Sequence, residues 1–279
     1  MDDAGCVAGL LRRGRERLHA SDSAALDAQM LLCHCLQKNR SYLMAWPEAT
    51  VEPAVAEQYW QLITRRENGE PVAYLTGQRD FWTLTLQCKN STLIPRPETE
   101  MLVDVALTLC DAPQARVLDL GTGTGAIALA LASERPRWHI QACDLVPEAV
   151  ALAEQNRSAN RLHNVVINQS NWFEQINSSD FNLIVSNPPY IDEQDHHLKE
   201  GDVRFEPHSA LVADNHGMAA IEHITTEAKN YLCSDGWLLF EHGYDQAERA
   251  RQLLKLLGYR NVQSWRDLAG IERVTGGKQ

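Results

Sequence analysis

Residues 116–132 place three glycines at alternate positions between a strand and a helix. The apolar run from Val117 to Leu120 indicates a buried strand, and the alanine-rich run after Gly125 indicates a helix. Glycine adopts backbone conformations that are closed to residues with a Cβ, and it lets the backbone pass close to a ligand. The spacing Asp-x-Gly-x-Gly-x-Gly differs from the Gly-x-Gly-x-x-Gly dinucleotide fingerprint, and no Lys-Ser or Lys-Thr pair follows, which disfavours a phosphate-binding P-loop. The segment therefore predicts a ligand at a glycine turn, with an ordinary strand–helix joint as the alternative.

Apolar strands and helical segments alternate from residue 115 onward. Strands are expected at 116–120, 139–144, 165–169, 181–186 and 236–242. This alternation predicts an α/β fold with a parallel sheet that helices cover on both faces. Ligands of such sheets lie beyond the carboxyl ends of the strands, and Asp144 stands there, where a ribose diol would be bound. A helix at 246–257 and two antiparallel strands near 262–265 and 272–275 are expected to close the sheet.

The first eighty residues predict helices at 6–18, 24–36 and 53–65. Ser21 and Asp22 offer N-caps to the second of these helices, and Pro53 begins the third. Alternating apolar residues then predict a strand at 81–88, within a hairpin that bridges two domains. We expect a helical domain at 1–78, a linker with the hairpin at 79–93 and a larger domain at 94–279.

The strand at 181–186 ends in Asn187-Pro188-Pro189-Tyr190, where two prolines prevent further ladder pairing and fix the backbone direction. A carboxamide, prolyl carbonyls and an aromatic ring thus lie on one rigid turn. Asn187 and a neighbouring carbonyl can accept both hydrogens of a planar –NH2 group, while Tyr190 covers its face. We interpret the turn as a clamp for an amide or amine nitrogen, with Asn187, Pro188 and Tyr190 as catalytic residues and Pro189 as a further substrate-binding residue. The alternative is a proline-terminated strand with an incidental asparagine.

The composition limits the partners and the compartment. The formal charge of −11 disfavours broad nucleic-acid binding, which depends on neutralising phosphates. No apolar stretch approaches the roughly eighteen residues that span a bilayer, and the acidic start Met1-Asp2-Asp3 lacks the features of a signal peptide. Seven scattered cysteines in a chain of 279 residues fit a reducing cytoplasm. We expect a cytoplasmic monomer without direct nucleic-acid or membrane contacts.

Two histidine-containing segments raise the question of a metal site. In Cys33-His34-Cys35, residues two apart on a helix point about 200° apart, so both sulfurs cannot face one ion. His196 and His197 follow the Asn-Pro-Pro-Tyr turn, but no carboxylate and histidine at helical spacing complete a site there. The sequence therefore predicts no bound metal.

In this order, the glycine turn and the Asn-Pro-Pro-Tyr turn resemble the class I S-adenosylmethionine-dependent methyltransferases, in which the second motif is typical of enzymes that methylate planar nitrogens. Four further segments resemble the release factor glutamine methyltransferases: Leu-Ile-Pro-Arg-Pro-Glu-Thr-Glu at 93–100, Asp-Val-Arg-Phe-Glu-Pro at 202–207, Glu-Arg-Val-Thr at 272–275, and the end of the helical region at 69–77. The resemblance covers nearly the whole chain. It implies a Rossmann-like domain with a mostly parallel seven-stranded sheet, preceded by a small helical substrate-recognition domain.

The activity implied by this resemblance is methylation of the glutamine amide in the Gly-Gly-Gln loop of bacterial peptide chain release factors. S-adenosylmethionine would be the cofactor and S-adenosylhomocysteine the product. Residues of the glycine turn would contact the methionine part, with Asp119 near its ammonium group; these residues are Gly121, Thr122, Gly123, Thr124 and Gly125. Asp144 would bind the ribose hydroxyls, and Asn187 would contact both cofactor and substrate.

Other residues of the cofactor site are less sharply defined by the resemblance. Trp172 would lie near the adenine, with a plain core aromatic as the alternative. Asn171 stands where the family commonly has an acid, so the acceptor for the adenine amino group stays open. Arg96 and its neighbours would order the loop over the methionine end, and Glu98 or Glu100 could instead cap the helix that runs through residue 109.

Three other functions compete with release factor methylation. The Asn-Pro-Pro-Tyr device also serves DNA adenine and rRNA guanine methylation, but such enzymes usually have a basic groove or an added recognition domain, and this acidic chain has neither. A sister family methylates a glutamine of a ribosomal protein. A non-catalytic scaffold is the third alternative, which the intact clamp and cofactor motifs disfavour.

Overall fold

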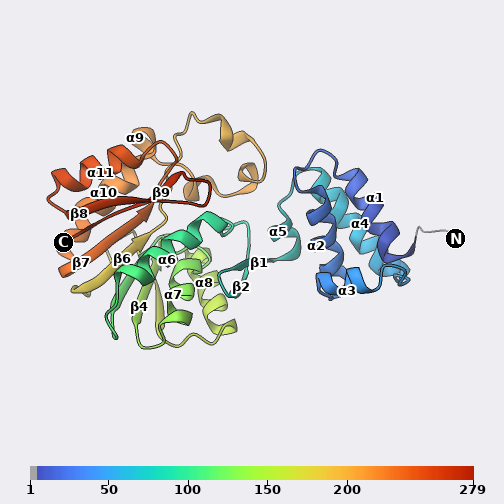
Figure 1. Ribbon diagram of the computed structural model, residues 1–279, viewed down its shortest axis with the longest axis horizontal. Coiled ribbons are helices and arrows are strands. Elements are labelled where there is room, and N and C mark those ends of the chain that lie inside the picture. The colour runs from blue at the N-terminus through green and yellow to red at the C-terminus, as the bar shows by residue number, and fades with distance from the viewer. Residues whose placement is uncertain (1–4) are drawn as a thin grey trace. The chain divides into compact units, whose positions relative to one another are not determined.

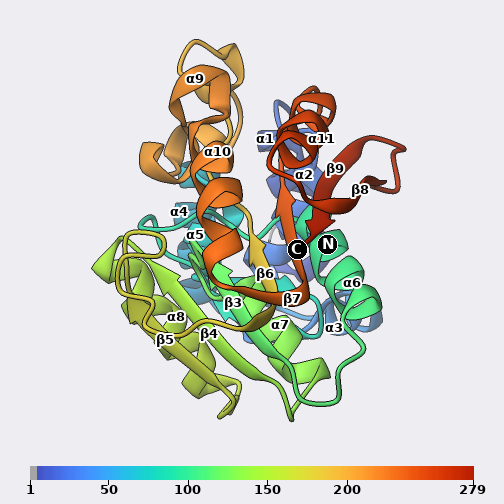
Figure 2. The ribbon, with the colours of Figure 1, turned by 90° about the vertical axis from the view of Figure 1, so that its left-hand side faces the viewer.

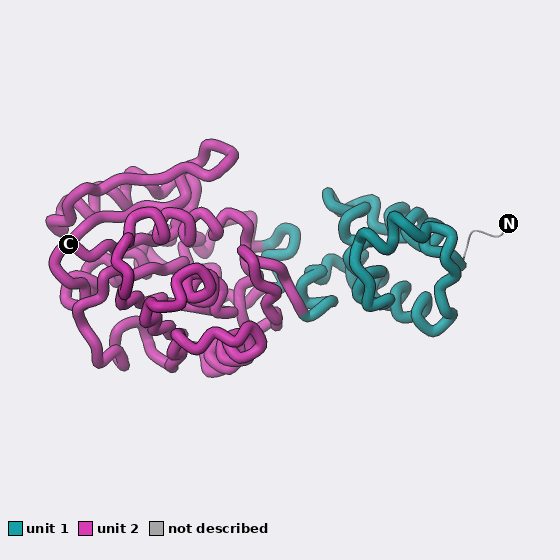
Figure 3. Tube along the Cα trace, turned by 60° about the horizontal axis from the view of Figure 1, so that its bottom comes forward, with its two compact units in different colours: residues 1–77, 199–205 teal, residues 78–198, 206–279 magenta. Residues whose placement is uncertain are grey.

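The computed structural model describes residues 5–279, which form two compact units. One unit contains the chain up to Gly77 together with residues 199–205, and the other contains residues 78–198 and 206–279 (Figures 1 and 3). The acidic start Met1-Asp2-Asp3 lies outside the described residues. Within residues 5–279, no helix combines the length and apolarity needed to cross a membrane.

The first unit is helical. Its helices are α1 (Val7–Arg17), α2 (Ala24–Leu36), α3 (Arg40–Ala45), α4 (Pro53–Glu67) and α5 (Val72–Thr76). Local signals set their ends: Pro53 occupies the first turn of α4, and the Asn39 side chain caps α3 by accepting from the Tyr42 N–H. Leu31, Leu32 and Tyr59 are fully buried in the core of this unit. The three helices expected from the sequence are confirmed, with α4 two residues longer than predicted.

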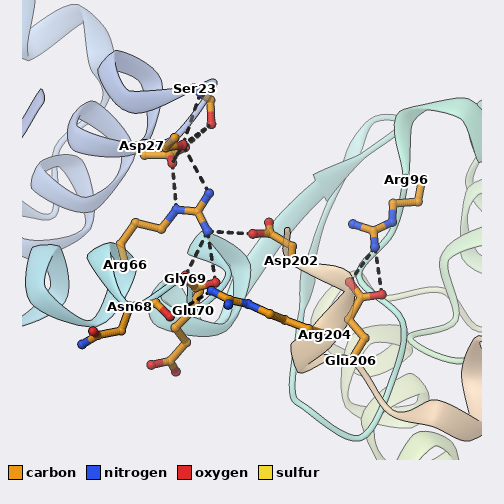
Figure 4. A network of polar contacts seen from close by, with 11 residues as sticks. Ser23, Asp27, Arg66, Asn68, Gly69, Glu70, Arg96, Asp202, Arg204 and Glu206 are labelled. Carbon is orange, nitrogen blue, oxygen red and sulfur yellow. Dashed lines mark hydrogen bonds and ion pairs between the residues drawn. The ribbon is translucent and has the colours of Figure 1, made fainter. Parts of the chain in front are cut away.

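Residues 199–205 fold onto this helical unit although they follow the Asn-Pro-Pro-Tyr turn in sequence. Arg66 joins them to α2: its Nε lies 2.8 Å from Asp27 Oδ2 and its Nη1 lies 2.6 Å from Asp202 Oδ1 (Figure 4). Ser21 and Ser23 donate further hydrogen bonds to Asp27. Because Arg66 and Asp27 are largely buried, loss of Arg66 would leave the charge of Asp27 uncompensated, whereas loss of Asp27 would leave Arg66 with Asp202 as its partner.

The second unit begins with a hairpin of β1 (Gln78–Phe81) and β2 (Leu84–Gln87). Its main sheet has seven strands in the order β5-β4-β3-β6-β7-β9-β8, in which β9 runs antiparallel to both neighbours and the first five strands are parallel. The strands are β3 (Arg116–Leu120), β4 (His139–Asp144), β5 (Val165–Gln169), β6 (Phe181–Ser186), β7 (Leu232–Glu241), β8 (Arg260–Arg266) and β9 (Glu272–Lys278).

Helices cover both faces of this sheet (Figures 1 and 2). On β3, Val117 packs into one core with α6 (Glu100–Leu109) and α7 (Ala126–Glu134), while Leu118 packs into the other core with α10 (Ala219–Glu227) and α11 (Ala247–Leu256). This alternation is the two-residue period of a strand buried on both faces. Helix α8 (Pro147–Ala159) joins β4 to β5, and the short α9 (Asp214–Gly217) precedes α10.

The predicted α/β fold with a mostly parallel seven-stranded sheet is confirmed, as are the closing antiparallel strands. The strand expected at 236–242 instead spans Leu232–Glu241. The hairpin expected around residues 81–88 is confirmed, but its strand begins later than predicted, at Leu84, because Trp82 adopts a left-handed φ of 56° and turns the chain between β1 and β2. Alternating apolar residues marked the buried face of the hairpin but did not reveal the turn inside it.

Candidate active site

The carboxyl ends of β3, β4 and β6 surround a cavity of about 170 Å³. A single water needs only about 10–15 Å³, so the cavity can hold a ligand of many atoms. Residues 121–124 of the glycine turn line it together with Asp144, Trp172, Asn187 and Pro189. The structure thus brings together most residues that the sequence predicted for the cofactor site. Gly125, Pro188 and Tyr190 lie outside the lining.

The glycine turn has left-handed backbone at all three glycines, with a φ of 70° at Gly121 and 86° at Gly125. A Cβ on Gly121 would lie 3.5 Å from the Trp172 ring, on the wall of the cavity. A Cβ on Gly125 would lie 3.0 Å from Leu129 Cδ1, a tighter contact than side chains normally make. Gly121 therefore shapes the cavity, whereas Gly125 allows the first turn of α7 to pack closely behind it.

Asp144 ends β4 on the wall of the cavity and is held by backbone amides. Its Oδ2 accepts from the Gly123 N–H at 2.9 Å, and its Oδ1 accepts from the Val146 N–H at 3.0 Å. Burial raises the pKa of this carboxyl, and the two amide hydrogen bonds counteract that effect. Each carboxylate oxygen keeps a further lone pair, so the fixed group can still accept hydrogen bonds from a ligand.

Asp119 is fully buried behind the glycine turn and does not line the cavity. Its Oδ2 accepts from the Thr122 hydroxyl at 2.6 Å and from the Ala128 N–H at 3.3 Å. Among residues 5–279, no group hydrogen-bonds to its Oδ1. Burial raises its pKa to about 7, although Thr122 and Ala128 act in the opposite direction. In this position Asp119 orders the glycine turn through Thr122.

Trp172 and Asn171 follow β5 at the same edge of the sheet, and both line the cavity. Trp172 is partly buried and has a left-handed φ of 50°, which directs the chain away from the strand. The Asn171 Nδ2 donates to Glu174 Oε1 at 2.7 Å. This contact leaves the Asn171 carboxamide oxygen as an acceptor at the cavity.

The Asn-Pro-Pro-Tyr turn follows β6, and its residues are anchored separately. The Asn187 Nδ2 donates to Thr99 Oγ1 at 3.2 Å. Pro188 is buried, and Pro189 lines the cavity. The Tyr190 hydroxyl donates to Glu241 Oε1 at 3.1 Å, and its backbone carbonyl accepts from the Gln246 side chain at 2.9 Å. Burial raises the pKa of Tyr190, and the Glu241 charge adds to that effect.

Two residues behind this turn were missed in the sequence. Thr99 and Glu241 are 4% and 2% exposed, and the Thr99 hydroxyl donates to Glu241 Oε2 at 2.7 Å. The position of Glu241 at the end of a strand could have indicated its role. Because β7 lies beside β6, the last residue of β7 is expected near Asn187. The sequence alone did not establish that the two strands are neighbours.

The segment around Arg96 is ordered by a buried ion pair. The Arg96 Nη2 lies 2.7 and 2.8 Å from the two carboxylate oxygens of Glu206, whose side chain is fully buried (Figure 4). Arg96 itself lines the cavity. Glu100 stands in the first turn of α6, where its charge suits the helix N-terminus, and its Oε1 accepts from the Trp82 N–H at 2.8 Å in the turn between β1 and β2.

Asp195, His196 and His197 bring one ligand atom each within 4.8 Å of the others. Asp195 was not predicted beside these histidines, and its carboxylate lies 2.7 Å from His197 Nδ1. Both histidines are exposed, and such contacts are common on protein surfaces without an ion. Cys33 and Cys35 are free thiols whose pKa burial raises, which disfavours the thiolate form that binds metals.

A glycine turn after β3, an acid after β4 and an Asn-Pro-Pro-Tyr turn after β6, on this sheet, define a class I methyltransferase. The fold resembles that of a methyltransferase from Pyrococcus furiosus, with a TM-score of 0.54 and 18% identity over 70% of this chain and 88% of that chain. It also resembles the catalytic domain of hMettl16, with a TM-score of 0.57 and 15% identity over 81% of this chain and 82% of that chain.

Residues 9–77 match the family model described as PrmC N-terminal domain, and residues 98–203 match the methyltransferase small domain. Full-length relatives are named release factor glutamine methyltransferase. That of Shewanella oneidensis is 51% identical over 100% of this chain and 98% of its own length, and that of Escherichia coli is 50% identical over 96% and 97%. The chain belongs to the release factor glutamine methyltransferase family.

The pKa of Asp119 predicts a pH-dependent stability. In the range between the ordinary value of 3.8 and about 7, the folded protein retains a proton on Asp119 that the unfolded chain has released. The corresponding stability is therefore fully present below the lower value and is lost as the pH rises through about 7. We expect Asp119→Asn to remove this dependence. Its free energy of unfolding relative to wild type should rise by roughly 2–4 kcal/mol between pH 4.5 and pH 8, because one pKa unit corresponds to about 1.4 kcal/mol.

Urea unfolding at both pH values measures this difference, without added cofactor. Asp104→Asn, on the exposed surface of α6, is the matched control and should show no such rise. Equal pH dependence in Asp119→Asn and wild type would contradict the assignment.

Proposed function

We propose that this protein transfers a methyl group from S-adenosylmethionine to the side-chain amide nitrogen of the glutamine in the Gly-Gly-Gln loop of bacterial peptide chain release factors. The observation on which the proposal depends is the Asn-Pro-Pro-Tyr turn at the edge of a glycine-lined cavity, in a chain half identical to release factor glutamine methyltransferases over its full length. Release factors act during translation, so we expect the enzyme in the cytoplasm.

The residues around the cavity fit this cofactor. The backbone of 121–124 offers glycines with left-handed φ beside the space where a ligand would approach closely. Asp144 presents an immobilised carboxylate for a ribose diol, and the Asn171 oxygen is oriented as an acceptor by its bond to Glu174. Trp172 supplies an aromatic face for the adenine. When bound, S-adenosylmethionine would supply a methyl group on a positively charged sulfur, which is a strong leaving group.

The clamp would act by orientation. An amide nitrogen is a weak nucleophile because its lone pair is delocalised into the carbonyl. Asn187 Oδ1 and the Pro188 carbonyl would accept the two amide hydrogens of the substrate glutamine and hold its nitrogen toward the cavity, while the Tyr190 ring would cover one face. Such positioning is worth roughly 7–11 kcal/mol when it is fully realised. Electron-rich oxygens beside the nitrogen would also stabilise the positive charge that develops on it. The methylated nitrogen would then lose one proton to water, which gives the neutral N-methyl amide and S-adenosylhomocysteine.

The functional assay compares classes of acceptor. The protein is incubated with radiolabelled S-adenosylmethionine and, separately, with purified release factors, ribosomal proteins, DNA and rRNA. We expect label on release factors alone, and mass spectrometry should place one added methyl group on the glutamine of the Gly-Gly-Gln loop. Label on a ribosomal protein or on nucleic acid would replace the proposal by one of its alternatives.

Mutations should distinguish the residues that position the substrate from those that bind the cofactor. Asn187→Ala should reduce kcat by at least about 100-fold, as removal of an oriented hydrogen-bonding group typically does, while the cofactor Kd changes much less. Asp144→Ala should instead weaken cofactor binding strongly, because the cavity loses its ribose acceptor. Isothermal calorimetry measures the Kd, and the labelled-cofactor assay measures kcat. Wild-type turnover in the first variant, or an unchanged Kd in the second, would contradict the assigned roles.

We further propose that the helical unit recognises the release factor. Its α3 end exposes Met44 and Trp46, which are 75% and 62% accessible, and large exposed apolar side chains of this kind often anchor protein partners. Met44→Ser with Trp46→Ser should raise the KM for intact release factor by about tenfold. The cofactor Kd and kcat should not change. Leu268→Ser, an exposed apolar residue of the other unit, is the control; equal KM values in all three proteins would argue against this surface.

A further inference from the structure

A carboxamide clamp works in only one of two orientations. The oxygen and nitrogen of an asparagine side chain exchange places when the group rotates by 180°. If Asn187 holds a glutamine amide as proposed above, its Oδ1 must face the substrate, because its Nδ2 can only donate and the substrate –NH2 group also donates. The active site therefore needs a structural element that fixes which end of Asn187 points where.

A buried chain of hydrogen bonds ends on the nitrogen of this carboxamide. Asn187 Nδ2 donates to Thr99 Oγ1 at 3.2 Å, and Thr99 Oγ1 donates to Glu241 Oε2 at 2.7 Å. Thr99 ends the short helix Pro97–Thr99, and Glu241 ends β7. Since Ser186 pairs with Phe240 in the parallel β6–β7 ladder, Asn187 and Glu241 leave the sheet at the same level. The three groups thus come together from three separate segments.

The number of protons that each group carries decides which group donates in each of these hydrogen bonds. An ionised carboxylate can only accept, and a threonine hydroxyl has one proton. When that proton is donated to Glu241, the oxygen of Thr99 can only accept from Asn187. The group that faces Thr99 is then the –NH2 end of the carboxamide, and Oδ1 points the other way. We infer that Thr99 and Glu241 are positioning residues that set the orientation of the Asn187 carboxamide for the substrate amide.

The environment of Glu241 suits this role. Its second oxygen accepts from the Tyr190 hydroxyl at 3.1 Å, so both oxygens have donors and the carboxylate also positions the aromatic residue of the same turn. Burial raises the pKa of Glu241, whereas the hydrogen bonds from Thr99 and Tyr190 and the charge of Arg273 favour its ionised form. The carboxylate does not line the cavity, so it acts through Thr99 and Tyr190.

The test removes the Thr99 hydroxyl, which links Asn187 to Glu241, and hardly changes the shape of the site. Thr99→Val is nearly isosteric and lacks the hydroxyl, so Asn187 loses the contact that sets its orientation. We expect kcat on release factor to fall roughly 10- to 100-fold, the factor that corresponds to one or two lost hydrogen bonds. Thr99→Ser retains the hydroxyl and should restore kcat to within about threefold of wild type. The cofactor Kd of both variants, measured by calorimetry, should stay close to the wild-type value.

Glu241→Gln is the second variant. Its carboxamide can donate to Thr99, which frees the Thr99 proton for Asn187 Oδ1 and favours the wrong orientation. Its kcat should fall at least as far as that of Thr99→Val, because Glu241 also holds Tyr190. The two changes combined should cost little more than Glu241→Gln alone, because Thr99 and Glu241 belong to one chain of hydrogen bonds. Thr225→Val removes the hydroxyl of another buried threonine, which does not line the cavity, and serves as the control for a loss of stability.

The outcomes separate this inference from the proposed function. Wild-type protein that fails to methylate release factor would overturn the function. Active wild type together with unchanged kcat in Thr99→Val would overturn the positioning role, as would a fall in kcat that Thr99→Ser does not restore. A fall equal to that of Thr225→Val would also overturn it, since it would reflect stability alone.

Discussion

The parallel pairing of β6 with both β3 and β7 is the constraint on which the site depends. Ser186 pairs with Leu120 on one side and with Phe240 on the other. The residues that follow are Gly121, Asn187 and Glu241, and they leave the sheet at the same level. A slip of one residue would exchange side chains between the two differently packed cores on the faces of the sheet, so the close packing of both cores favours this register. The packing of the core thereby sets the spacing between the cavity and the clamp.

Two buried acids make the same kind of contact behind the carboxyl ends of the strands. Asp119 and Glu241 are both buried acids, and each accepts from a threonine hydroxyl, Thr122 in one case and Thr99 in the other. Both threonines line the cavity. The acids differ in how fully they are satisfied: Glu241 has donors on both oxygens, whereas Asp119 Oδ1 lacks one among the described residues. Burial raises the pKa of both carboxyls, and at Asp119 the hydrogen bonds that oppose this effect reach only one of the two carboxylate oxygens.

The sequence predicted what depends on local pattern. The bounds of β3, β5 and β6 follow from short apolar runs that end at glycine, polar or proline residues. The glycine turn and the Asn-Pro-Pro-Tyr turn were visible because proline and glycine restrict the backbone locally. The turn inside 81–88 was not visible, since Trp82 adopts a φ that its residue type seldom shows.

Contacts between segments that are far apart in the chain could not be predicted from the sequence. Thr99 and Glu241 are separated by 142 residues, and Arg66 and Asp202 by 136. Each pair is formed by residue types that occur commonly on surfaces, so only the tertiary fold distinguishes them. For Glu241 that distinction bears on the chemistry. A methyl transfer to an amide nitrogen depends on alignment, and the nitrogen becomes strongly acidic once it has gained the methyl group. A buried carboxylate whose oxygens already accept from Thr99 and Tyr190 is poorly placed to remove that proton, but well placed to hold the groups that align the amide.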